Sequence, residues 1–119
     1  MMNSNVVGDM ILNQEQSEAR KLIMDYLDRR GARHSMVGYP YAVMAAEYLV
    51  DHPDVMARRQ LRAALEAVEG ADPAGRTRKA IDRCIRTMIM QMDEDATVKE
   101  LVFAIADHVC LALKRKTIR

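Results

Sequence analysis

Five cationic side chains between residues 76 and 86 are the part of this chain best suited to chemistry. Four of them recur at helical spacing, so on a helix they would form one exposed stripe. The stripe consists of Arg76, Lys79, Arg83 and Arg86, and Arg78 lies beside it. Such a stripe suits a polyanion, since arginine and lysine bind phosphates and also match the acceptor pair on guanine. The pattern also fits a solvated face, because many surface helices carry four basic residues and bind nothing.

The positions of these cations along the helix predict different contacts with duplex DNA. A recognition helix enters the major groove with its N-terminal half against the base edges. We therefore expect Arg76 and Lys79 to contact bases. Arg83 and Arg86 lie one and two turns further on and should contact phosphates. Arg78 is turned partly aside and can pair with the acid four residues later.

The helix that must position this stripe is predicted between Asp72 and Met92. Asp72 is a good N-cap, and Pro73 suits the first helical position. The opposite face is apolar and consists of Thr77, Ala80, Ile81, Cys84, Ile85, Met88 and Ile89. Met92 shares this face, whereas Met90 points elsewhere and can reach a partner. A short helix over residues 61–69 and a tight turn at 70–72 come first, which is the order of a helix-turn-helix.

The rest of the chain predicts four further helices and no strand. The first covers residues 14–30 and is ended by Gly31, and the second covers residues 39–51 and is ended by His52-Pro53. The third covers residues 55–69, with a break near Arg59. The last begins with a Thr97–Glu100 capping box. The expected fold is all-α, a single compact bundle of about five to six helices with an embedded helix-turn-helix. Its core should contain Leu22, Tyr41, Leu65, Ile81, Ile85, Leu101 and Ile105. We expect a flexible segment over residues 1–13, followed by one domain over residues 14–119.

The distribution of charge along the chain and the lack of long apolar runs restrict the kinds of partner that we expect. The net charge is only +1, but residues 56–92 and the last six residues each carry an excess of four positive charges, whereas residues 1–28 carry an excess of three negative ones. One face of the protein can therefore meet a polyanion. No secretory leader and no apolar run of about 20 residues is apparent, so we expect a cytoplasmic protein without a membrane span.

Groups for catalysis or metal binding are scarce. Cys84 and Cys110 are expected as buried free thiols, and His34, His52 and His108 as structural or solvated side chains. No phosphate-binding glycine loop and no acid, base or nucleophile constellation is visible. We therefore expect no enzyme activity, no metal, no cofactor and no small-molecule substrate.

Residues 18–115 resemble, in order, the C-terminal effector domain of the stage-zero sporulation protein A family of response regulators. The most specific block is a helix ending in glycine, then a Gly-Tyr-x-Tyr segment and an alanine-rich helix. The matching residues are Gly31, Gly38, Tyr39, Tyr41, Ala45, Ala46 and Val50. Downstream, RTRKAIDRCIR resembles the recognition helix of the family, with Arg76, Ala80, Ile81 and Ile85 in register, and TVKELVFAIADHVCLALK resembles its closing helix.

The resemblance implies an all-helical domain that binds DNA and regulates transcription. The chain departs from the family in three respects. The region between Asp54 and Ala80 is shorter, Arg78 stands where the family usually has an acid, and Asp82 stands where it has a base. The receiver domain has no counterpart, so we expect no control by aspartyl phosphorylation.

Two function classes therefore stay open. The first is a small helix-turn-helix regulator that binds double-stranded DNA, with a homodimer as a possible form. The second is a member of the family that lost DNA binding and acts as a protein–protein interaction module. The basic stripe favours the first class, and the near-neutral net charge and the shortened region favour the second.

Overall fold

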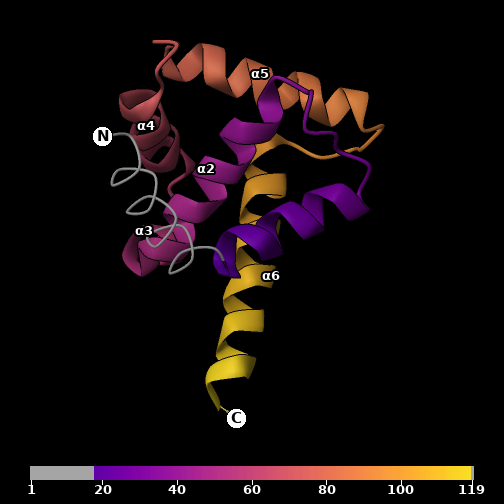
Figure 1. The fold of residues 1–119 in the computed structure, drawn as a ribbon. Coiled ribbons are helices and arrows are strands. Elements are labelled where there is room, and N and C mark those ends of the chain that lie inside the picture. The colour runs from indigo at the N-terminus through magenta and orange to yellow at the C-terminus, as the bar shows by residue number, and fades with distance from the viewer. Residues whose placement is uncertain (1–17, 119) are drawn as a thin grey trace, which may run out of the picture.

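The computed structural model describes residues 18–118, and over these residues the chain forms six helices and no strand (Figure 1). Within the described residues the first helix covers residues 18–29, and its predicted start at residue 14 lies outside them. The others are α2 (Gly38–Asp51), α3 (Pro53–Ala57), α4 (Leu61–Ala71), α5 (Arg78–Gln91) and α6 (Val98–Ile118). The predicted all-α fold is confirmed. The expected flexible segment over residues 1–13 lies outside the described residues.

Helix α2 is the centre of the bundle and contacts α3, α4, α5 and α6. In Figure 1, α5 lies across the top of the molecule, α4 lies to one side, and α6 runs down to the C-terminus. Helix α2 can be surrounded in this way because Ala42, Ala45 and Ala46 are buried and leave room for close neighbours. Gly38 brings its first turn against the backbone of α5, where a β-carbon would lie only 2.9 Å from the Ile85 Cα.

The predicted core is largely confirmed. All but one of the expected residues are buried, namely Tyr41, Leu65, Ile81, Ile85, Leu101 and Ile105. Leu22 is only partly buried. The face of the 18–29 helix that packs against the core is centred on Ile23 and Leu27, which are both fully buried. Leu22 precedes Ile23 by one residue and therefore points about 100° away from it.

Two of the predicted helix ends are confirmed by their hydrogen bonds. The 18–29 helix ends at Gly31, whose φ of +92° suits glycine. The Ala32 amide then donates to the Leu27 carbonyl at 3.0 Å, as in a Schellman motif. At the start of α6, the Thr97 and Glu100 side chains each accept from the other residue's amide, at 3.0 and 2.8 Å. This is the expected capping box.

The region expected as one helix over residues 55–69 is divided, as the predicted break near Arg59 allowed. Arg59 has φ +55°, and it separates α3 from α4. His52 ends α2 as predicted, but Pro53 immediately opens α3, since proline is favourable in a first helical turn. Cys84 and Cys110 are free, as predicted, but both are only partly buried. The prediction that both thiols are buried is therefore wrong, because each cysteine lies at the edge of its helix's buried face.

Candidate nucleic-acid interface

The basic helix begins later than the sequence predicted. Thr77 is the N-cap of α5, and its hydroxyl accepts from the Ala80 amide at 3.2 Å. Asp72 instead follows the last turn of α4, and Pro73 is not helical. The tight turn expected at residues 70–72 is a longer connection over residues 72–77, in which Gly75 has φ +72°. Helices α4 and α5 nevertheless pack against each other.

Asp72 organises this connection rather than the helix. Its carboxylate accepts from the Ala74 amide at 3.1 Å and from the Arg76 amide at 2.9 Å. It also accepts from the Tyr41 hydroxyl at 2.9 Å. An aspartate that bonds amides two and four residues later stabilises a turn, so its capping capacity is already used. The prediction of an N-cap at Asp72 is therefore wrong.

Arg76 lies in the connection and not on the helical stripe. Its guanidinium donates to the Tyr41 hydroxyl at 2.6 Å and lies 5.6 Å from the centre of that ring. Tyr41 belongs to α2 and is buried, so the contact ties the residues before α5 to the central helix. We call Tyr41, Asp72 and Arg76 the brace.

The ionisation of the brace favours the same bonds. Burial acts to raise the pKa of the Asp72 carboxyl, but the amides of Arg76 and Ala74, the Tyr41 hydroxyl and the charge of Arg76 together outweigh it and hold that pKa below its usual value. Burial raises the pKa of the Tyr41 hydroxyl. Asp72 is therefore charged and Tyr41 is neutral at physiological pH. Each is in the form that its hydrogen bonds require.

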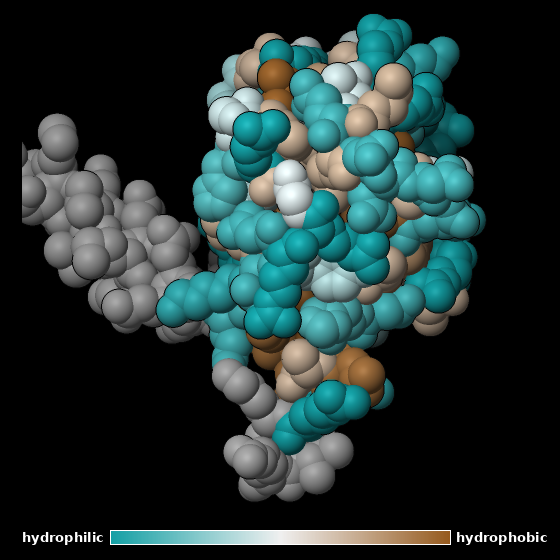
Figure 2. Space-filling view, turned by 90° about the vertical axis from the view of Figure 1, so that its right-hand side faces the viewer, coloured by the Kyte–Doolittle hydropathy of each residue, from teal (hydrophilic) through white to brown (hydrophobic). Residues whose placement is uncertain are grey.

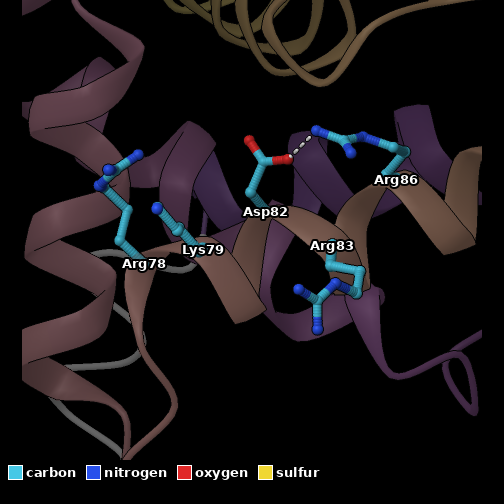
Figure 3. Close-up of a pocket in the computed structure, with 5 residues that line it drawn as sticks. All are labelled: Arg78, Lys79, Asp82, Arg83 and Arg86. Carbon is cyan, nitrogen blue, oxygen red and sulfur yellow. Dashed lines mark hydrogen bonds and ion pairs between the residues drawn. The ribbon is translucent and has the colours of Figure 1, made fainter.

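The other four cations gather on the outer side of α5 (Figure 3). Arg78, Lys79, Arg83 and Arg86 line a shallow hollow of about 330 Å³ together with Asp82. We call these four cations the α5 basic face. In Figure 3, Arg78, Asp82 and Arg86 extend to one side of the helix, and Arg83 extends to the other. The positive charge therefore spreads across the width of the helix.

Asp82 pairs with Arg86 and not with Arg78. The carboxylate lies 2.5 Å from the Arg86 guanidinium; the Arg86 side chain is exposed and that of Asp82 is partly buried. The prediction that Arg78 pairs with Asp82 is therefore wrong. Two arginines lie four residues from Asp82, and the pair with the acid on the N-terminal side is the more favourable on a helix.

Met90 continues the α5 basic face toward the C-terminal end of the helix. It is 73% exposed, whereas Met88 and Met92 are buried, as their helical positions predicted. Met90 follows Lys79 by three helical turns and Arg86 by one, so it lies on the same side of α5. The outer surface of this helix is thus basic, with one acid and one apolar side chain.

The Gly-Tyr-x-Tyr block holds the site in place. Gly38 allows α2 to reach the backbone of α5, and the Tyr39 hydroxyl donates to Asp28 at 2.8 Å. Tyr41 completes the brace. The sequence singled out this block but not these contacts. The unusual composition of the block was the signal that the sequence offered for its importance. Its contacts could not be predicted, because the partners lie far away along the chain.

The histidines lie against aromatic rings. His52 stacks on Tyr48 with ring centres 3.8 Å apart, and His34 lies 4.4 Å from the Tyr39 ring. Within residues 18–118, no three His, Cys, Asp or Glu side chains are placed to hold a metal ion. In the same part of the chain, no helix combines the length and the apolar character that crossing a membrane requires.

The α5 basic face and the brace that precedes it form the candidate site. Comparison with known proteins gives no relative from which to transfer a role. No protein-family model, no curated protein and no solved structure matches this chain.

Proposed function

We propose that the chain is a small cytoplasmic DNA-binding regulator of transcription that contacts duplex DNA through the α5 basic face. One observation carries this proposal: four cations stand on the outer side of a single helix whose inner side is fully buried. Ile81, Ile85 and Met88 have no exposed surface, so α5 is held firmly while its cations face outward. A rigid helix with outward cations suits the major groove.

The ion pair between Asp82 and Arg86 is compatible with binding. The Arg86 side chain remains 66% exposed in the pair. The Asp82 side chain is 22% exposed, but the arginine end of the pair is largely in solvent, so the pair is weak and a phosphate can replace the carboxylate as the partner of Arg86.

Within this proposal Arg76 supports the site instead of contacting a base. Its guanidinium already bonds the Tyr41 hydroxyl, and its amide bonds Asp72. Lys79 then remains the N-terminal cation best placed for base edges. Arg83 and Arg86 are assigned to phosphates, and Arg78 flanks them.

The test is a titration of wild-type protein with a random duplex of about 20 base pairs at several salt concentrations, followed by fluorescence anisotropy. The variant replaces Lys79, Arg83 and Arg86 with alanine. We expect its affinity to fall and the slope of log K against log salt to decrease by about two units, because Arg83 and Arg86 are assigned to phosphates and each lost phosphate contact removes about one. The control replaces Lys21, Arg29 and Arg33, which are also exposed, and removes the same charge.

A second candidate function is a protein–protein interaction module without DNA binding. Met90 favours it, because an apolar side chain that is 73% exposed beside arginines suits the contact surface of a protein partner. This candidate replaces the first if wild-type protein shows no salt-dependent binding at low salt. It also does so if the triple variant binds as tightly as wild type.

A further inference from the structure

The end of α6 carries apolar side chains beyond the core of the bundle. Val109 is fully buried, whereas Leu111, one half-turn later, is 51% exposed. In Figure 1 the last turns of α6 extend below the other helices, and Figure 2 shows brown apolar atoms at this lower end. Together with the apolar groove beside it, an exposed leucine on a helix that leaves the core indicates a surface that is covered in use.

An apolar groove lies beside this part of α6. Its floor is formed by Val50 of α2, Met56 of α3 and Cys110 and Leu113 of α6, and the hollow measures about 820 Å³. Asp107 and Lys114 stand at its edge on α6, and both are exposed. Lys114 has no ion pair among the described residues.

The charges along this edge of α6 are complementary to the same edge of a second, antiparallel copy. Asp107 and Lys114 are seven residues apart, so they lie in nearly the same direction from the helix axis. Cys110 and Leu111 fall midway between them along the helix and roughly 50° to either side of that direction. If a second α6 runs antiparallel across this point, each Asp107 meets a Lys114, and Cys110 meets Leu111.

We propose that a second copy of this chain covers the groove, with the two α6 helices packed antiparallel about a two-fold axis between Cys110 and Leu111. Such an interface is self-complementary, as a two-fold dimer requires. Two identical Asp107–Lys114 pairs flank an apolar centre, to which each Leu111 contributes. Asp107 also lies 3.1 Å from Arg59, so each carboxylate would join two cations. The interface is separate from the α5 basic face, and this proposal is independent of DNA binding.

Sedimentation velocity over a range of protein concentrations tests the dimer. We expect wild type to dimerise, and Lys114→Glu to raise the dissociation constant at least about tenfold, because two like-charge contacts replace two attractive ones. The double variant Asp107→Lys with Lys114→Glu should restore dimerisation in part, since the charges across the interface are exchanged but the pair between residue 107 and Arg59 is lost. Lys99→Glu is the matched control, because it makes the same change in the first turn of α6. Thermal unfolding of each variant checks that it is folded.

Crosslinking tests the position of the axis. Packed helices lie about 8–10 Å apart. The two Cys110 residues of the dimer, one on each side of the two-fold axis, would be offset by only about 1.5 Å along the direction of the helices. A short bis-maleimide should therefore join two chains through Cys110 in a Cys84→Ser background, and should fail with Cys110→Ser. A wild-type protein that remains monomeric overturns the proposal and leaves the groove to another occupant. A dimer that is unaffected by Lys114→Glu, or that does not crosslink through Cys110, overturns it as well.

Discussion

Gly38 controls how closely α2 approaches α5, and Gly38→Ala tests this contact directly. A β-carbon at this position would lie 2.8 Å from the Cys84 carbonyl carbon and 2.9 Å from the Ile85 Cα. Nonbonded carbon atoms prefer about 3.5–4.0 Å, so the overlap is roughly 1 Å. The Cys84 carbonyl oxygen lies nearer still, and all three neighbouring atoms belong to the backbone of α5, so a side-chain rotation cannot relieve the overlap.

The expected loss of stability follows from two opposing terms. Overpacking of this kind costs about 1–3 kcal/mol. Replacing glycine by alanine in a helix returns at most about 1 kcal/mol, and less in a first turn. We therefore expect Gly38→Ala to lower the free energy of unfolding by about 1–2 kcal/mol. With an m-value of about 1.5 kcal/mol/M, the urea midpoint falls by roughly 1 M.

The assay is urea unfolding followed by circular dichroism, with Gly70→Ala as the matched control. Gly70 lies in α4, and a β-carbon there would meet no atom within 4 Å. The same substitution should therefore stabilise the protein at Gly70, by about 0.5–1 kcal/mol, because alanine favours the helix. Opposite signs at the two positions are the expected result. A Gly38→Ala variant as stable as wild type would refute the close packing of α2 on α5.

Two further predictions concern the brace and the last helix. The pKa of the Asp72 carboxyl is lowered below 3.8 in the fold, so its contribution to stability is complete above about pH 5 and is lost progressively as the pH falls from there through the lowered pKa of the folded state. Urea midpoints measured between about pH 3 and 6 should depend less steeply on pH in Asp72→Asn than in wild type, and equal slopes would contradict this. Thr97→Ala removes the hydroxyl that accepts from the Glu100 amide and should lower the free energy of unfolding by about 1 kcal/mol. Thr87→Ala, an exposed threonine within α5, is its control and should change stability by less than half as much.

The sequence alone determined most of the helices, because their limits depend on nearby residues. Gly31 ends the first helix through its own φ, and Thr97 and Glu100 cap α6 within a single turn. The break at Arg59 and the buried face of α5 likewise follow from local residue order. Signals of this range act over a few residues, so one sequence suffices to find them.

Only the tertiary structure decided how Asp72, Asp82 and Gly38 are used. Asp72 can cap a helix or a turn equally well, and the buried hydroxyl of Tyr41, from α2, selects the turn. Gly38 depends on the approach of α5, which lies more than 40 residues away in the chain. Asp82 has an arginine four residues to either side and bonds only one of them. Where local alternatives are close in energy, contacts made only in the folded chain select among them. Such contacts explain why Arg76 lies in the brace and not in the predicted stripe.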